Sequence, residues 1–261
     1  MIQKKTMGKV MEITDRQNLI LERVIKEYVD LAEPISSGLL EKKYDFNLSP
    51  AMIRIEMEKL TDAGYLFQPF VSSGRVPTDK GYRYFVDKLL NEKSVKAKEP
   101  KKLRDLLDKE GDDFWGFGQS FTKMLSQMSS MMAVVSFPEE DRLFKEGWEN
   151  IVRMPEFADR ETIFGLTDFI NDMERNIDDV CEESPGSDKL QTGITIYIGE
   201  ESPFGKVKGF TIISSSCSFP KKKRGTISLI GPKRMAYERN IGILNSFSEI
   251  MEELLNNGQR K

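Results

Sequence analysis

The sequence predicts an α+β protein with two domains, and three features of the chain indicate this. Residues 49–87 show a helical pattern that runs into short extended stretches, β-rich runs bounded by Gly and Pro follow residue 191, and residues 91–102 are charged and poor in large apolar side chains. A chain of 261 residues is long enough for two cores. We predict a first domain over residues 13–90, a linker over residues 91–102 and a second domain over residues 103–256.

The first domain opens with two predicted helices. Thr14 is a candidate N-cap, and the segment after it carries apolar residues at helical spacing, at Leu21, Val24, Ile25, Tyr28 and Ala32. Pro34 prevents this helix from continuing. Ser36 and Ser37 then cap a short second helix that runs through Tyr44.

A third helix follows the pair Ser49-Pro50, which is a strong start signal because Ser caps free N–H groups and Pro fits the first turn. Its inward positions are Ile53, Met57 and Leu60. Gly64 closes it, since Gly takes the left-handed conformation at no cost. The opposite face carries Ala51, Arg54, Ile55, Glu58 and Asp62.

Two extended stretches complete the first domain. An apolar strand from Tyr65 runs on to Val71, a tight turn follows over residues 72–75, and a second extended step passes through Val76. Two helices joined by a short turn, followed by a strand, an Arg-bearing turn and a strand, predict a winged helix-turn-helix. This arrangement reads DNA by placing a helix in the major groove and a loop beside the backbone.

The later part of the chain mixes helices and strands. After a helix that begins near Thr78 or Asp79, residues 103–132 read as two helices interrupted by Gly111, Gly116 and Gly118. Residues 133–137 are predicted to form a buried strand, and residues 144–179 are predicted to be mostly helical with a break near Pro155. The runs after residue 191 predict an antiparallel sheet, and residues 236–255 predict a final helix.

Composition excludes several classes of protein. The chain has no histidine, which removes the commonest general base and metal ligand, so we expect no enzyme, no metal and no cofactor. Cys181 and Cys217 are too far apart in sequence to suggest a disulfide framework or a zinc motif. No apolar run is long enough for a bilayer and no secretion signal is visible, so we expect a cytoplasmic protein without membrane contacts. The net charge of −3 means that DNA binding must depend on local charge.

The candidate DNA-binding residues lie on the third helix, in the turn and just after it. They are Ser49, Ala51, Arg54, Ile55, Glu58, Ser72, Ser73, Arg75, Lys80 and Arg83. Arg54 is the candidate for base reading, because a guanidinium can hold guanine through two hydrogen bonds. Its alternative role is a surface ion pair with Glu58 one turn later. Arg75 is expected at the wing tip, where it would contact a phosphate or the minor groove. Its alternative role is that of an arginine in the turn without a DNA contact.

Several stretches resemble the HrcA family of heat-inducible transcription repressors. The resemblance rests on DRQNLILERVIKEYVDLAEPISS, on MIRIEMEKLTDAGYLFQPF followed by the specific string VSSGRVPTDKGYRYFVD, and on FKEGWENIVRMPEF, YIGEESPF and GTISLIGPKRMAYERNIGILNSFSEIMEELL. It implies a dimeric repressor that binds an inverted repeat, the CIRCE element, upstream of the groE and dnaK genes. It also implies a link to the GroEL chaperonin, a GAF-like second domain and an inserted dimerisation domain.

The chain departs from the family pattern in two places. Family members generally run longer, so the GAF-like domain and the dimerisation region are expected to be reduced here. The family commonly reads T-I-R-N-E-M where this chain has Met52 to Met57, with Ile55 in place of Asn. Because Ile can make only apolar contact, for instance with a thymine methyl, we expect the operator to differ from the family consensus near that base.

Two functions from different classes follow. The first is a sequence-specific repressor of chaperone operons that binds operator DNA as a homodimer, with a chaperonin as a further partner. The alternative is a module that senses a small molecule or a partner and uses its winged helix for protein contacts.

Overall fold

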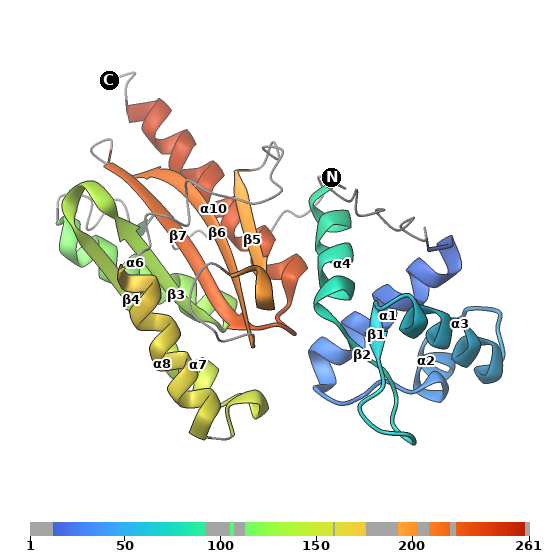
Figure 1. Ribbon diagram of the computed structural model, residues 1–261. Helices are drawn as coiled ribbons and strands as arrows, with labels where there is room; N and C mark the ends of the chain where they lie inside the picture. The colour runs from blue at the N-terminus through green and yellow to red at the C-terminus, as the bar shows by residue number, and fades with distance from the viewer. Residues whose placement is uncertain are drawn as a thin grey trace, which may run out of the picture. The chain divides into compact units, whose positions relative to one another are not determined.

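A computed structural model describes residues 13–91, 105–106, 113–158, 160–175, 193–202, 209–219 and 223–258. The chain divides into two compact units between Phe85 and Val86 (Figure 1). Apart from Asn91, the predicted linker lies outside the described residues, as do residues 1–12 and Cys181. Each unit is described by itself.

The first unit consists of helices and a short two-stranded ribbon. Its elements are α1 (Asp15–Leu31), α2 (Ser37–Lys43), α3 (Pro50–Asp62), β1 (Leu66–Phe67), β2 (Val76–Pro77) and the first part of α4 (Asp79–Asn91). Thr14 caps α1 through a capping box with Gln17, and Ser36 caps α2. These N-caps confirm the helix starts that the sequence predicts.

The ribbon is shorter than predicted. β1 pairs antiparallel with β2 through Leu66 and Pro77 and through Phe67 and Val76, and it does not extend to Val71. Pro69 has no N–H for a ladder, and the chain turns directly after it, with the Ser73 N–H bonded to the Phe70 carbonyl. The predicted strand through Val71 is therefore wrong beyond Phe67.

The second unit is built on one antiparallel sheet of order β4-β3-β7-β6-β5. The strands are β3 (Met132–Phe137), β4 (Arg142–Glu146), β5 (Ile194–Ile198), β6 (Phe210–Phe219) and β7 (Lys223–Pro232). The helices are α6 (Phe114–Ser129), α7 (Trp148–Val152), α8 (Arg160–Arg175) and α10 (Tyr237–Gly258), and the single 3-10 turns are η1 (Pro138–Glu140), η2 (Pro155–Phe157) and η3 (Gly199–Glu201). The α+β class and the antiparallel sheet are confirmed.

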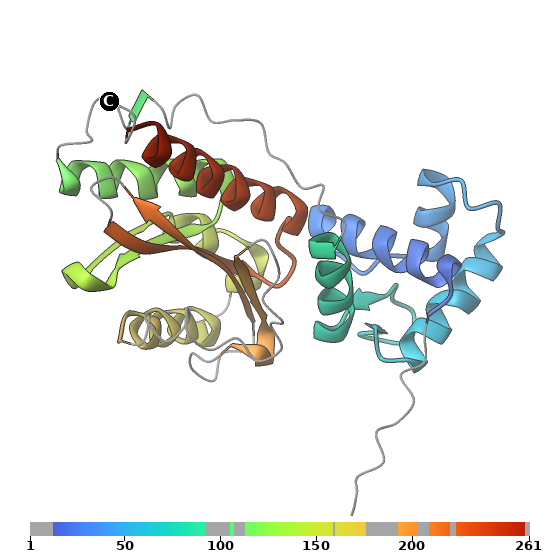
Figure 2. The same cartoon turned by 90° about the horizontal axis from the view of Figure 1, so that it is seen from above.

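Helices cover both faces of this sheet (Figure 2). α6 and α10 lie on one face, where the ring of Phe121 packs against Phe219 and Phe247 at centroid distances of 5.5 and 5.2 Å. α8 lies on the other face, where Phe169 stacks on Phe210 at 5.0 Å. Because both faces are covered, β3 is buried along its whole length.

Two expectations for the second unit are wrong. Gly116 and Gly118 lie inside α6 and do not break it; a Cβ on Gly118 would come within 2.5 Å of the Phe144 ring, so this glycine admits the edge strand β4. Residues 142–146 form that strand, so the predicted helical stretch is wrong at residues 144–146, which pair with β3. None of the helices in the described ranges is long and apolar enough to cross a bilayer.

Candidate nucleic-acid interface

Helix α3 is shaped by local residues at both ends. The Ser49 hydroxyl accepts a hydrogen bond from the Met52 N–H at 3.4 Å, and Pro50 occupies the first helical position. Gly64 follows the helix with a φ of +78°, a conformation that other residues rarely adopt. The side chains of Ile53, Met57 and Leu60 are buried as predicted.

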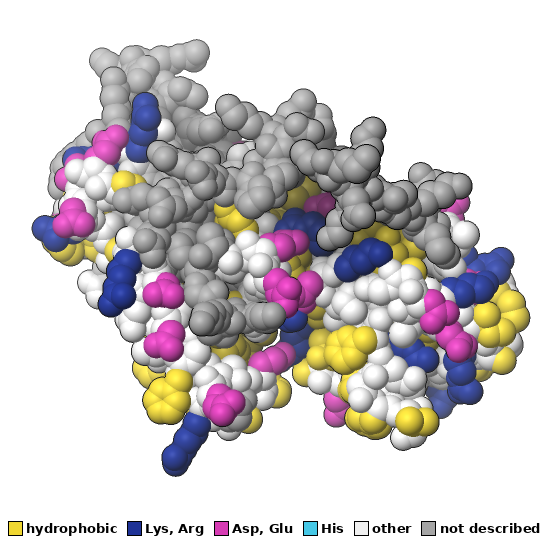
Figure 3. Space-filling model, viewed as in Figure 1, with side chains coloured by type: hydrophobic (Ala, Val, Ile, Leu, Met, Phe, Trp, Pro, Cys, Tyr) yellow, Lys and Arg dark blue, Asp and Glu magenta, His cyan; other side chains and the backbone are white. Residues whose placement is uncertain are grey.

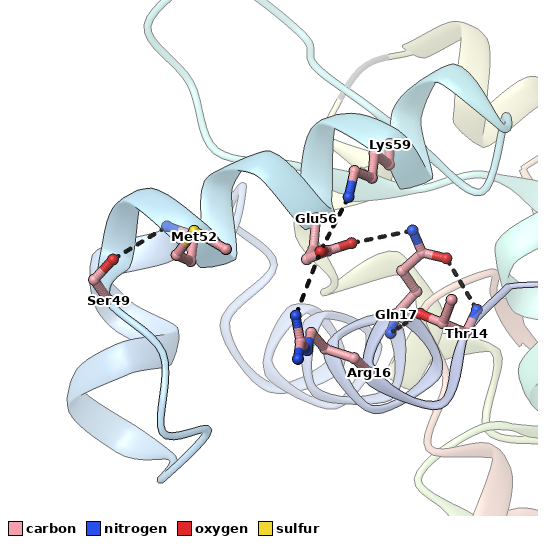
Figure 4. Close-up of polar contacts among 7 residues, drawn as sticks. All are labelled: Thr14, Arg16, Gln17, Ser49, Met52, Glu56 and Lys59. Atoms are coloured by element: carbon pink, nitrogen blue, oxygen red, sulfur yellow. Dashed lines mark hydrogen bonds and ion pairs between the residues drawn. The ribbon is translucent and has the colours of Figure 1, made fainter.

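One buried carboxylate, that of Glu56, joins α3 to the start of α1 (Figure 4). Glu56 is only 5% exposed; its Oε2 accepts from the Gln17 amide at 3.1 Å and its Oε1 from Lys59 Nζ at 3.2 Å. Arg16 lies 3.9 Å from the same carboxylate. Gln17 is itself held by the Thr14 N–H at 3.0 Å, so the start of α1 fixes the middle of α3. Glu56 is not among the residues predicted from the sequence, although its position three residues after Ile53 places it on the inward stripe.

The outward face of α3 carries the predicted reading residues. Ala51, Met52, Arg54, Ile55 and Glu58 are all exposed. Ile55 is 45% exposed and Met52 40%, which makes the face partly apolar. Within the described residues, Arg54 and Glu58 do not form the ion pair that their spacing allows, so both side chains are available to a partner.

Arg75 lies at the base of the β1–β2 loop and not at its tip, which corrects the predicted position. Its N–H donates to the Ile35 carbonyl at 2.8 Å, its carbonyl accepts from the Ile35 N–H at 2.9 Å, and its Nε donates to the Thr61 hydroxyl at 3.1 Å. The loop is thereby tied to both α3 and the segment before α2. Gly74 makes this approach possible, since a Cβ there would lie 2.3 Å from the Ile35 carbonyl oxygen.

A hollow of about 450 Å³ lies between α3, the start of α2 and the loop. Of the predicted site residues it collects Arg54, Glu58, Ser72, Ser73 and Arg75. Ile35, Ser36, Ser37, Met57, Gln68, Val71 and Gly74 complete its lining. Two arginines against one glutamate give this surface a local positive charge that the whole chain lacks.

Lys80 and Arg83 do not line the hollow. Lys80 Nζ donates to the Ala63 carbonyl at 2.7 Å and lies 4.3 Å from the centre of the Tyr65 ring. It thus satisfies a free carbonyl at the end of α3, where a cation also favours the helix dipole. Arg83 is half-buried on α4 and is already engaged in an interaction of its own. Ser49, Ala51 and Ile55 lie on α3 or at its start, outside the lining.

A second buried carboxylate, Glu27, fastens α2 to α1. Its Oε2 accepts from Lys43 Nζ at 2.8 Å and its Oε1 accepts from the Tyr44 hydroxyl, while Arg23 lies 4.8 Å from the centre of the Tyr44 ring. Burial raises the pKa of the Glu27 carboxyl, but the hydrogen bonds from Lys43 and Tyr44 lower it by more, so the pKa lies below its ordinary value. The same contact raises the pKa of Lys43. Glu27 is therefore ionised in the folded unit at neutral pH.

Comparison with known proteins gives the chain a family context. Residues 84–241, more than half of the chain, match the family model described as HrcA protein C terminal domain. A protein of Symbiobacterium thermophilum named heat-inducible transcription repressor HrcA is 24% identical over 341 aligned positions, covering 93% of this chain and 98% of the relative. One of the same name from Alkaliphilus metalliredigens is 42% identical over 130 residues, which are 49% of this chain and 38% of the relative.

The alignment with the Symbiobacterium relative is longer than this chain, because 341 positions exceed 261 residues. The relative therefore has segments without a counterpart here. A solved structure, described as a crystal structure of a hypothetical protein at 2.2 Å resolution, is 18% identical with a TM-score of 0.72 and covers 93% of this chain and 98% of its own. That likeness concerns the fold alone.

Proposed function

The chain belongs to the HrcA family as a shortened member, and on that premise we propose that it is a heat-inducible transcription repressor. The proposal assigns DNA binding to the first unit, as a winged helix-turn-helix. It assigns regulation and dimerisation to the second unit, as a reduced GAF-like domain. The observation that carries the proposal is the hollow in which the outward face of α3 meets the β1–β2 loop, with Arg54 and Arg75 on its wall.

In this proposal α3 enters the major groove and the loop lies beside it along the backbone. Arg54 reads a guanine, since it is exposed and forms no ion pair with Glu58 in the described residues. Ile55 and Ala51 contact the groove floor. Ser49, Ser72, Ser73, Arg75 and Arg83 are assigned to phosphates, and Lys80 is assigned chiefly to stabilising the end of α3, since its ammonium group already holds a carbonyl there.

The partners follow from this mode of binding. An inverted repeat needs two copies of α3 at fixed spacing, so we propose a homodimer on operator DNA of the groE and dnaK class. A GroEL-type chaperonin is proposed as the partner that assists the DNA-binding form. The site of action is then the cytoplasm, where the operator is.

Substituting Arg54 tests the assignment. Arg54→Ala should weaken binding to an inverted-repeat duplex by about 1–3 kcal/mol and relax the preference for guanine at one position of each half-site. Fluorescence anisotropy at several salt concentrations measures the affinity, and base-by-base replacement in the duplex measures the preference. Arg153→Ala removes the same charge from an exposed site in the second unit and should bind as the parent does. Equal affinity of all three proteins would contradict the role of Arg54.

A further inference from the structure

The tip of the β1–β2 loop is apolar. Phe70 is 63% exposed and Val71 is 98% exposed, and these two residues are called the apolar tip below. Figure 3 shows hydrophobic side chains on the surface over this loop. Two consecutive large apolar side chains are seldom left exposed at a loop tip, because exposure forgoes the free energy of their burial. Such a pair marks a contact surface.

The loop is closed by its own hydrogen bonds. The Ser73 N–H donates to the Phe70 carbonyl at 2.9 Å, and the Ser73 hydroxyl accepts from the Phe70 N–H at 3.2 Å. The Gln68 amide donates to the carbonyls of Val71 and Ser73 at 2.8 and 3.0 Å. With these backbone groups satisfied inside the loop, the apolar tip is held in one conformation before any partner arrives.

We propose that the apolar tip is a minor-groove wedge: Phe70, supported by Val71, inserts between two adjacent base pairs of the operator and bends the duplex. The inference rests on the proposed function, because it needs α3 in the neighbouring major groove. It adds a second means of recognition, through DNA deformability, to the hydrogen bonds of Arg54.

The surroundings of the apolar tip favour DNA as its occupant. Val71 lines the same hollow as Arg54 and Arg75, so one partner seated there would contact Val71 together with both cations, next to Phe70. A nucleic-acid backbone supplies the negative charge that these arginines need, and the stacked bases behind it supply an apolar surface. Phe is among the side chains that proteins insert between base steps. A tip already held in place by Gln68 and Ser73 loses little entropy on insertion.

A wedge predicts where sequence preference arises. Pyrimidine–purine steps unstack most easily, so the operator should favour such a step at a fixed distance from the bases that α3 reads. No hydrogen bond to that step is required.

Selection from a random duplex library tests the proposal with the whole chain. The parent protein should enrich a motif with two parts, the bases read by α3 and a pyrimidine–purine step beside them. Phe70→Ala should enrich the first part alone and bind the selected duplex about tenfold more weakly, with a smaller bend by fluorescence energy transfer between the duplex ends. Phe164→Ala, which removes a phenyl group that is 68% exposed on α8, is the matched control and should behave as the parent does.

The outcomes separate the wedge from the function on which it rests. If the parent protein enriches no motif, the proposed DNA binding fails. If the parent and Phe70→Ala enrich the same two-part motif with equal affinity and bend, the wedge is refuted while DNA binding stands. If Phe70→Ala bound DNA as the parent does but lost binding to another protein, the wedge would also be refuted. The apolar tip would then be a protein-docking surface.

Discussion

Glu56 shows how a single side chain ties the helix α3, the proposed reading helix, to the rest of the first unit. It is buried, yet it is bonded to Gln17 and Lys59, so its charge is compensated inside the unit. The bond to Gln17 joins two segments 39 residues apart. Because Glu56 ties α3 to the start of α1, this bond helps to set the direction in which Arg54 and Ile55 face.

Ile55 provides a prediction at the same scale. Ile55→Asn restores the amide that the family commonly carries at this place, and an amide can pair with adenine through two hydrogen bonds. We expect the variant to bind the family repeat more tightly than the parent does, by about 1–3 kcal/mol. Competition between the family repeat and duplexes selected by the parent measures the change. Full affinity of the parent for the unmodified family repeat would contradict the idea.

Single residues differ in how far sequence alone describes them. The exposure of Arg54 and Ile55 follows from helical spacing, and the capping by Ser49 follows from the Ser-Pro pair. The bonds of Glu56 to Gln17 and of Lys80 to Ala63 could not be predicted, since each joins residues that are distant in sequence. Arg75 lies away from the predicted tip because the turn closes between Phe70 and Ser73, two residues earlier than the Ser-Gly signal indicates.

At the scale of elements, the junction between the β1–β2 loop and the segment before α2 controls the shape of the hollow. Ile35 and Arg75 exchange two backbone hydrogen bonds across it. Gly74 sits against this bridge with no room for a side chain. The loop can therefore hold its place next to α3 only while residue 74 is glycine.

Gly74→Ala should displace the loop. The added methyl would lie 2.3 Å from the Ile35 carbonyl oxygen, and relieving such a clash costs about 1–3 kcal/mol of unfolding free energy. Urea unfolding followed by circular dichroism measures the loss. Gly38→Ala is the matched control: a Cβ there meets nothing within 4 Å, and alanine favours a helix by up to about 1 kcal/mol. If Gly74→Ala were as stable as the parent or more stable, the bridge between Ile35 and Arg75 would leave room for the added methyl group.

The contact between α1 and α2 predicts a dependence on acid. The folded pKa of Glu27 lies below its ordinary value of 4.5, so the stabilisation is complete above that value and is lost as the pH falls through the folded pKa. Glu27→Gln removes this pH-dependent stabilisation. We expect the parent to lose more unfolding free energy than the variant between about pH 5 and pH 3.

Thermal unfolding over that range of pH measures the difference for Glu27. Glu58→Gln, at an exposed position on α3, should follow the parent curve. Parallel curves for the parent and Glu27→Gln would mean that the carboxylate is not held by Lys43 and Tyr44 in solution.

Elements were predicted well where local signals suffice and poorly where packing decides. The starts of α1, α2 and α3 follow from Thr14, Ser36 and Ser49. Sequence alone predicts a helix break at Gly118, because nothing local reveals the Phe144 ring that packs against it. Sequence alone also predicts helix at residues 144–146, because the pairing of β4 with β3 is a tertiary contact.

At the scale of the whole molecule, the chain combines a proposed DNA-binding unit with a compact second unit. That second unit has aromatic side chains on both faces of its sheet, with Phe169 and Phe210 on one and Phe121 and Phe219 on the other. Relatives carry segments that this chain lacks, and the family resemblance places dimerisation among them. In the proposed mechanism, the dimer that binds an inverted repeat would form through the residues that this chain retains.

The stoichiometry of the complex with operator DNA tests the proposed repressor mechanism most directly. Analytical ultracentrifugation of the whole chain with an inverted-repeat duplex, and with a duplex that holds one half-site, gives binding and stoichiometry together. We predict two chains per inverted repeat and much weaker binding to the half-site, because the two copies of α3 act as one unit. A single chain that binds the inverted repeat and the half-site equally well would contradict a dimeric repressor. So would a chain that binds neither duplex.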